Sequence, residues 1–377
     1  MSTELVHFCK RVPANSASPV SGPRLRPRDE LMERRIPLAS KLSIILTDRC
    51  NIRCRHCMPE CTPEKSTTLG WADLKTLIES AARVPTMKTL CFTGGEAFMY
   101  PELLADCIAL THRLGLESTV ISNAFWASSV SNAERMLRRL PGLARLALST
   151  DSFHQEFIGV GKVRHAIVAA RRLSIDCAVR ICHLDDPDAE IEAVRQQLAD
   201  VAGLYEIEHQ PVQPLGRAEL EVEYDRIFSY DTSMASCRSA DVHALNPNGS
   251  VTACCGGTGD WPANHLLDFG KPAEVGLDEI FKRAQASFAL HAVRLWGPAG
   301  LFRLARAQAQ HEGTDLPDPG IRNICELCKF LVADPARSAL LRRALDAPEA
   351  RSEIALARAR DFGEIESLLL LHEGEGA

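Results

Sequence analysis

Short apolar runs alternate with amphipathic segments from residue 41 onward. The runs at 43–46, 89–92, 118–121, 143–148, 177–182 and 205–209 have the length of buried strands. Between them, apolar residues recur at helical spacing, as at Leu74, Leu77, Ile78 and Ala81. These intervals predict helices that open near Trp71 and cover 101–114, 132–140, 162–173 and 186–202. Such alternation predicts an α/β fold with a parallel sheet and helices outside it.

The number of strand–helix units limits the architecture. Six units within residues 41–212 are too few for a closed eight-fold barrel of about 250 residues, so we expect a partial (β/α)6 TIM-like barrel. Residues 1–40 hold five prolines and predict a poorly ordered arm. Prolines end the alternation after Gln210, and 213–334 predict a small cysteine-containing domain. Residues 335–377 are rich in Ala, Arg, Leu and Glu and predict a closing helical tail.

Composition and charge narrow the class of protein. Hydrophobic residues make up 46% of the 377 and charged residues 24%, which is typical of a globular protein. A net charge of −6 gives no general attraction to nucleic acid or to an anionic membrane, so neither is an expected partner. No run reaches the roughly 18 apolar residues of a membrane span, and we see no secretion signal. We therefore expect a cytoplasmic protein whose fourteen cysteines bind metal rather than form disulfides.

Three of these cysteines lie in the segment directly after the first predicted strand. Cys50, Cys54 and Cys57 have the spacing C-x3-C-x2-C. Thiolates are the ligands of iron–sulfur clusters. Three of them would leave the fourth iron of a cubane cluster open to another ligand. The alternatives are a zinc site that lacks one ligand and three structural cysteines.

A second motif makes the loop more specific. Thr93-Gly94-Gly95-Glu96 follows the second strand, and Cys57 continues into Met58-Pro59. Together these motifs resemble those of the radical S-adenosylmethionine (SAM) enzymes. The resemblance implies the partial barrel, a [4Fe–4S] cluster on the three cysteines with SAM at its open iron, and reductive cleavage of SAM to a 5′-deoxyadenosyl radical. It also implies that Thr93, Gly94, Gly95 and Glu96 hold the methionine part of SAM.

Polar residues at later strand ends fit the same face of a barrel. The resemblance implies that SAM is also bound by His56, Met58, Ser122, Asn123, Ser149 and Asp151. Helix capping and turn formation are the alternatives for the Ser, Asn and Asp residues. The candidates for catalytic proton transfer are Asp151, His154 and Glu156.

A second set of cysteines lies beyond the barrel. Its expected ligands are Cys237, Cys254, Cys325 and Cys328, and the turn signal at 246–249 predicts a hairpin that brings the first two together. The layout resembles a SPASM/twitch-like extension; since no cysteine follows Cys328, it implies the twitch form with one auxiliary [4Fe–4S] cluster. Zinc is the alternative, and Cys255 could replace Cys254. The remaining cysteines have no ligand spacing and are expected to be core or incidental thiols: Cys9, Cys61, Cys91, Cys107, Cys177 and Cys182.

These features predict an oxidoreductase that abstracts hydrogen from a C–H bond of its substrate, with the auxiliary cluster assisting an oxidation or a crosslink. We favour modification of a ribosomally synthesised peptide. The alternatives are dehydrogenation, epimerisation or rearrangement of a small metabolite, and a non-catalytic iron–sulfur scaffold. Expected partners are an electron donor such as flavodoxin or ferredoxin, and a separate leader-peptide-binding protein. The second is expected because the N-terminal arm is too short to form a leader-binding winged-helix module.

Overall fold

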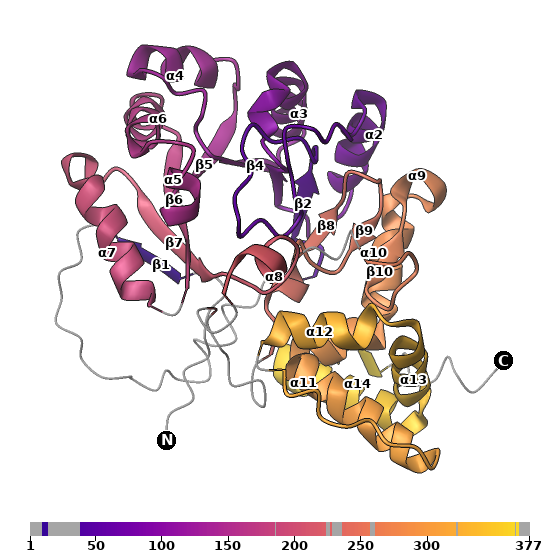
Figure 1. The fold of residues 1–377 in the computed structure, drawn as a ribbon. Helices are drawn as coiled ribbons and strands as arrows, with labels where there is room; N and C mark the ends of the chain where they lie inside the picture. The colour runs from indigo at the N-terminus through magenta and orange to yellow at the C-terminus, as the bar shows by residue number, and fades with distance from the viewer. Residues whose placement is uncertain are drawn as a thin grey trace.

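The chain is built around one mixed sheet with helices outside it (Figure 1). The computed structural model describes residues 10–13, 38–184, 186–223, 227, 236–256, 261–321, 323–365 and 367–368. Most of the arm expected at 1–40, together with Cys9, lies outside the described residues. Its backbone at Lys10–Pro13 forms β1, which pairs antiparallel with the last strand of the barrel.

Six adjacent parallel strands form the centre of the sheet. They are β2 (Lys41–Ile45), β3 (Thr89–Thr93), β4 (Glu117–Ser122), β5 (Leu143–Ser149), β6 (Asp176–His183) and β7 (Glu206–Pro211). Buried apolar residues stand opposite one another across this sheet, as Ile44 does with Phe92 and Phe92 with Val120. The α/β fold and its parallel sheet are confirmed, because each predicted apolar run became a strand.

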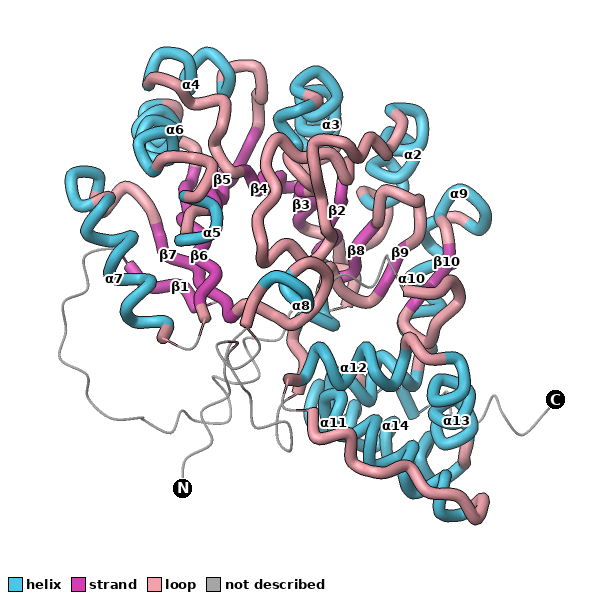
Figure 2. The backbone as a smooth tube through the Cα atoms, in the orientation of Figure 1, coloured by secondary structure: helices cyan, strands magenta, loops and turns pink. Residues whose placement is uncertain are grey.

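Helices follow the strands and cover the outer face of the sheet (Figure 2). They are α2 (Trp71–Ala81), α3 (Pro101–Arg113), α4 (Val130–Leu137), α6 (Val160–Arg172) and α7 (Pro187–Gln197). The short η1 (Ala97–Met99) precedes α3, α5 (Ser152–Gln155) precedes α6, and η2 (Ala199–Val201) follows α7. Asp186 caps α7 by accepting a hydrogen bond from the Ala189 amide at 3.0 Å. The helix expected to reach residue 202 ends at Gln197, since Leu198 leaves the helical region (φ −112°, ψ 18°).

The sheet continues across the boundary expected at residue 213. Strand β8 (His243–Leu245) pairs parallel with β2, and β9 (Val251–Thr252) and β10 (Asp268–Gly270) follow it antiparallel. The predicted hairpin joins β8 to β9: the Ser250 carbonyl accepts from the Asn246 amide at 2.8 Å, and Gly249 takes the left-handed conformation (φ 84°).

Helices dominate the rest of the chain. They are α8 (Ala218–Glu221), η4 (Ser239–Asp241), α9 (Pro272–Val275), α10 (Leu277–Ala286), α11 (Phe288–His311), α12 (Ile324–Val332), α13 (Pro335–Asp346) and α14 (Pro348–Phe362). The long α11 bends where Gly297 (φ 64°) precedes Pro298, and it packs against α12, α13 and α14. The two closing helices beyond residue 334 were predicted, whereas α9 to α12 were not.

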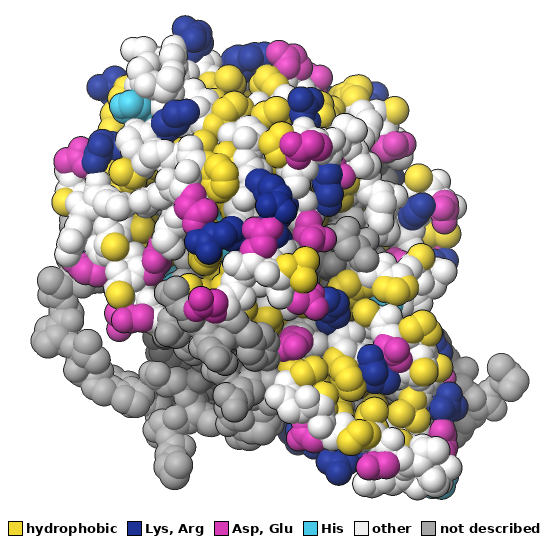
Figure 3. All heavy atoms as spheres, viewed as in Figure 1, with side chains coloured by type: hydrophobic (Ala, Val, Ile, Leu, Met, Phe, Trp, Pro, Cys, Tyr) yellow, Lys and Arg dark blue, Asp and Glu magenta, His cyan; other side chains and the backbone are white. Residues whose placement is uncertain are grey.

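The core and the surface of the protein are those expected from its composition. One continuous apolar core extends from the strands of the barrel to α10, α11 and α13. On the face that Figure 3 shows, basic and acidic side chains are intermixed rather than gathered by sign. Within the described residues, no helix combines the length and the apolar character that crossing a bilayer requires.

A buried ionic network fastens the closing helices to η4. The guanidinium of Arg294, with 2% of its side chain exposed, donates to Asp241 Oδ1 at 2.7 Å and to Glu364 Oε1 at 3.0 Å. Arg358 donates to Glu364 Oε2 at 2.9 Å. Because buried charges are costly unless they are paired, each partner requires the others.

We predict that Arg294→Met destabilises the protein by about 3–5 kcal/mol, because the buried Asp241 carboxylate would lose its ion-pair partner and Glu364 would keep only Arg358. Arg343→Met is the matched control: this arginine is half exposed and pairs with Glu312 on the surface, so the loss should be about 0–1 kcal/mol. Urea titration followed by circular dichroism measures both values, and equal losses in the two variants would contradict the role of the network.

Candidate functional site

Both cysteine sets border one cavity of about 270 Å³ at the carboxyl ends of the strands. The cavity wall includes the following predicted residues: Cys50, Cys54, His56, Cys57, Met58, Thr93, Gly94, Gly95, Ser122, Asn123, Ser149, His154, Cys237, Cys254, Cys325 and Cys328. Three predicted residues do not border it, namely Glu96, Asp151 and Glu156. The carboxyl ends of parallel strands are where such folds place their active sites.

The loop after β2 presents its three thiols to this cavity. Cys50 and Cys54 are buried and Cys57 is partly exposed. Burial raises the pKa of Cys50 to about 12, and burial together with the neighbouring thiols raises that of Cys54. A hydrogen bond with Cys61 lowers the pKa of Cys57 to about 7, with a smaller contribution from the charge of Arg217. Thiolates crowded in this way repel one another unless a cation binds them, which fits a metal centre.

The second set converges from three elements. Cys237 precedes η4, Cys254 follows β9, and Cys325 and Cys328 lie one turn apart on α12, which Asn323 caps by accepting from the Cys325 amide at 2.8 Å. Burial and the charges of Cys237 and Cys254 raise the pKa of Cys325 well above its ordinary value. Burial and the charges of the same two thiols also raise the pKa of Cys328. Cys254 and the exposed Cys255 both border the cavity; Cys254 acts on both thiols of α12, whereas Cys255 acts on Cys325.

The paired glycines bring strand β3 against the cysteine loop. The Gly95 amide donates to Thr47 O at 2.7 Å, and the Glu96 amide donates to Arg49 O at 2.9 Å. A Cβ at Gly95 would stand 2.2 Å from Arg49 O, and one at Gly94 would stand 2.5 Å from Thr47 O. Only glycine fits at these positions, so the motif supports the cysteine loop as well as bordering the cavity.

Glu96 lies behind the cavity wall. Its carboxylate, 1% exposed, accepts from the Phe98 amide at 3.1 Å, the Ser122 hydroxyl at 2.9 Å and the Asn123 amide at 2.8 Å. Burial raises the pKa of Glu96 to about 7, against these hydrogen bonds. In turn, Asn123 Nδ2 lies 3.9 Å from Cys50 Sγ and donates to the Asn51 carboxamide at 3.0 Å. Glu96 therefore orients residues that border the cavity.

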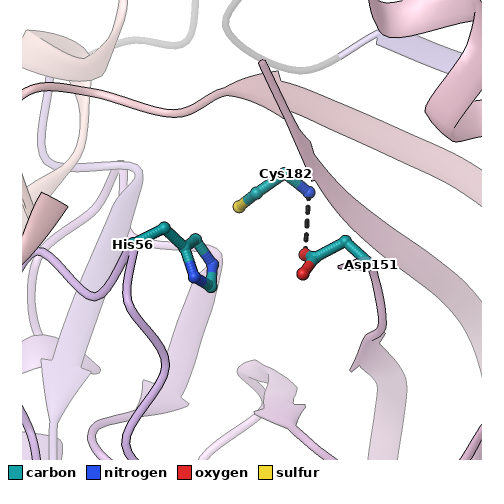
Figure 4. A group of neighbouring side chains, drawn as sticks. All are labelled: His56, Asp151 and Cys182. Carbon is teal, nitrogen blue, oxygen red and sulfur yellow. Dashed lines mark hydrogen bonds between the residues drawn. The ribbon is translucent and has the colours of Figure 1, made fainter. Parts of the chain in front are cut away.

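His56, Asp151 and Cys182 come from three different elements (Figure 4), and their ligand atoms lie within 4.8 Å of one another. Asp151 Oδ1 accepts from two backbone amides and from His154 Nδ1 at 2.9 Å, while Oδ2 accepts from the Cys182 amide at 3.0 Å. Four hydrogen bonds leave this carboxylate little capacity for a metal ion. It acts as the cap of α5 and holds the ring of His154 at the cavity.

The pKa values of Asp151 and His154 shift in opposite directions because the two side chains are paired. Burial alone would raise the pKa of Asp151, but His154, His56 and the hydrogen bonds hold it below its usual range. Burial opposes the charge of His154, yet Asp151 keeps the pKa of His154 above its ordinary value. Burial lowers the pKa of His56 to about 4, and its ring stacks on Phe153 at 4.8 Å. Glu156 lies apart from this group and pairs with Arg55 at the surface.

Sequence reasoning missed three residues of the site. Cys61 and Cys182, expected to be core or incidental thiols, border the cavity. Arg217 donates from Nη1 to Cys54 O at 2.7 Å and from Nη2 to Cys61 O at 2.9 Å. A single arginine or cysteine without motif spacing carries no signal in one sequence, so only the fold reveals these contacts.

Comparison with known proteins identifies this arrangement. The sequence model of the Radical SAM superfamily matches residues 44–198, which span the cysteine loop and the strands β3 to β6. Residues 44–198 are a radical SAM domain. The chain is 24% identical over 221 residues to the "Putative peptide biosynthesis protein YydG" of Bacillus subtilis (strain 168), covering 57% of this chain and 68% of that protein.

Other relatives share a shorter region of this chain. The "GTP 3',8-cyclase 1" of Mycobacterium tuberculosis (strain ATCC 25618 / H37Rv) is 32% identical over 140 residues, which is 36% of this chain and 37% of that protein. The chain thus spans little more than a third of that relative's length. Among solved structures, "Native anSMEcpe with bound AdoMet and Kp18Cys peptide" aligns with a TM-score of 0.51 and 12% identity, covering 82% of this chain and all of that one. This similarity establishes the fold.

We predict that Gly95→Ala displaces the cysteine loop of the radical SAM domain, because the new methyl group would overlap the Arg49 carbonyl. Overpacking of this kind costs about 1–3 kcal/mol, and iron bound at the loop should fall. Gly161→Ala, in α6 with no atom within 4 Å of the new Cβ, is the control and should keep its iron. Iron analysis and thermal unfolding measure both effects; wild-type iron in Gly95→Ala would show that the close approach is unimportant.

Proposed function

We propose that this radical SAM chain generates a 5′-deoxyadenosyl radical and uses it to abstract hydrogen from a C–H bond of a peptide. The observation that carries the proposal is the single cavity bordered by both cysteine sets. Cys50, Cys54 and Cys57 would hold the [4Fe–4S] cluster whose fourth iron binds SAM. When bound, the cluster and SAM supply the reductive cleavage that yields the radical.

The chain's own residues have separate tasks in this proposal. Thr93, Gly94 and Gly95 border the space for the methionine part of SAM, with Glu96 orienting Ser122 and Asn123 behind them. Ser149 and the backbone near Met58 contribute to the same wall. His154, whose pKa Asp151 raises against the effect of burial, can hold or release a proton at its Nε2 atom beside the cavity. Glu156 pairs with Arg55 at the surface, so a catalytic role is less favoured for it than its place in the sequence suggested.

The second set is proposed as a twitch-like auxiliary site that receives or conducts an electron from the substrate. A zinc ion bound by four thiolates brings the sulfurs to about 4 Å from one another, since each Zn–S bond is about 2.3 Å. A cluster bound by the same four thiolates would bring four irons, so metal analysis of the wild-type protein distinguishes the two occupants.

A peptide is the substrate class that the comparisons favour. The relative from Bacillus subtilis is named for peptide biosynthesis, and the solved structure of similar fold holds a peptide beside AdoMet. A small metabolite is the second candidate, since the cyclase relatives are named for a nucleotide substrate. Flavodoxin or ferredoxin as the electron donor, a separate leader-peptide-binding protein and a cytoplasmic location belong to the same proposal.

One experiment separates these substrate classes. Reconstituted protein, SAM and a strong reductant are incubated without oxygen with a deuterated cell extract that has been divided into peptide and small-molecule fractions. Deuterium in 5′-deoxyadenosine from the peptide fraction alone supports the proposal, and deuterium from the other fraction alone assigns a metabolite. Failure to form 5′-deoxyadenosine with a filled cluster would leave the non-catalytic scaffold.

We predict that Cys50→Ala, Cys54→Ala and Cys57→Ala each abolish 5′-deoxyadenosine formation, because two thiolates cannot hold a cluster with one open iron. Iron should fall by about four atoms per chain, while the auxiliary signal persists. Cys107→Ala is the matched control, since this thiol is buried in α3 away from the cavity. Normal SAM cleavage by any of the three variants would overturn the assignment.

We predict that Cys325→Ala combined with Cys328→Ala leaves SAM cleavage intact but stops product formation, because the substrate radical loses its electron acceptor. Wild-type protein should contain about eight irons and the double variant about four. Cys255→Ala should retain both clusters, because Cys254 is the proposed ligand and acts on both thiols of α12.

Circular dichroism of the double variant distinguishes loss of the electron acceptor from loss of the fold. Product formation at the wild-type rate would show that the second set is structural. Stoichiometric zinc in the wild-type protein would likewise refute the auxiliary cluster.

A further inference from the structure

Arg217 fastens two points of the cysteine loop from a distant part of the sequence. It follows β7 by six residues and precedes α8, and 3% of its surface is exposed. Its guanidinium donates to Cys54 O at 2.7 Å and to Cys61 O at 2.9 Å. A planar fork of N–H donors suits two carbonyl oxygens in a way that a lysine ammonium does not.

The backbone beside Arg217 is built against the same loop. The Arg217 amide donates to Cys57 O at 3.1 Å. Gly216 takes a left-handed conformation (φ 57°), and a Cβ there would stand 2.1 Å from Met58 O. The segment therefore contacts the loop through its backbone and its side chain together, which ties both flanks of Cys57.

The charge of Arg217 lies in different surroundings from the charges of the neighbouring arginines. Arg53 pairs with Glu221 at 2.9 Å and Arg55 pairs with Glu156, and both arginines are largely exposed. Among the described residues, the acceptors of the Arg217 guanidinium are the carbonyl oxygens of Cys54 and Cys61. None of the described carboxylates forms an ion pair with Arg217. A buried positive charge next to a cluster stabilises the state that carries more negative charge.

We propose that Arg217 is the positioning residue of the cysteine loop and that its buried charge favours the reduced state of the cluster bound there. The inference rests on the proposed function, because it requires a cluster on Cys50, Cys54 and Cys57. It adds a residue outside the cysteine and Gly-Gly-Glu motifs. Two separable effects follow: the hydrogen-bonding fork retains the cluster, and the charge eases its reduction.

The test uses the reconstituted full chain with Arg217→Gln, Arg217→Lys and the control Arg53→Gln. Iron retained after gel filtration reports on positioning. The ratio of reduced to oxidised cluster at a fixed solution potential, followed by electron paramagnetic resonance, reports on charge. The signal that shifts on addition of SAM identifies the cluster concerned and separates it from the auxiliary one.

Each variant has its own expected result. Arg217→Gln should lower the ratio of reduced to oxidised cluster about tenfold, the effect of a unit charge at about 10 Å with an effective dielectric constant of about 20. It should also lose iron. Arg217→Lys should lose iron while it keeps the ratio within about twofold, because the charge remains and the fork does not. Arg53→Gln should change neither quantity.

Wild-type iron and a wild-type ratio in Arg217→Gln would overturn the inference. If Arg217→Gln retains no cluster, Arg217→Lys decides: full iron retention there would refute the positioning role, and reduced retention would support it. A wild-type protein without a SAM-responsive cluster would instead refute the proposed function, so the two failures are distinct.

Discussion

The structure depends on holding three thiols close together in a buried loop. Burial and mutual repulsion oppose the thiolate form, as the raised pKa values of Cys50 and Cys54 show. The surrounding chain compensates with backbone contacts: β3 packs against Arg49 through Gly95, and Arg217 binds the opposite flank. The loop is thus fixed from both sides before any metal is considered, which is the preorganisation that a metal site requires.

This constraint explains why polar residues gather behind the cavity. Glu96 is too buried to face it, yet it orders the ends of β3 and β4 by accepting from Ser122 and Asn123. Asp151 does the same at the ends of β5 and β6 by accepting from the Cys182 amide and from His154. Buried carboxylates that cap neighbouring strands hold several backbone positions with few atoms, and each is satisfied by hydrogen bonds.

Sequence reasoning recovered what periodicity and spacing encode. Six apolar runs gave the six parallel strands, and the turn signal gave the hairpin between β8 and β9. The sequence could not predict where the side chains of Glu96 and Glu156 lie, because the direction of a side chain after a strand depends on tertiary packing. Arg217 was missed because its partners are backbone carbonyls more than 150 residues away. The kinked α11, hydrophobic on many sides, showed no helical stripe to read.

The two cysteine sets are connected by the same sheet. Strand β2 carries the loop with Cys50, and it pairs directly with β8, whose hairpin partner β9 leads into Cys254. The backbone ladder therefore fixes the spacing between these strands, from which Cys50 and Cys254 follow in the next residues of the chain. On the other flank, Asp241 and Arg294 fasten the segment after Cys237 to α11, against which α12 packs. The electron transfer proposed for the second cysteine set would require a fixed separation from the first, and the continuous sheet together with the buried ionic network is the part of this fold that can provide it.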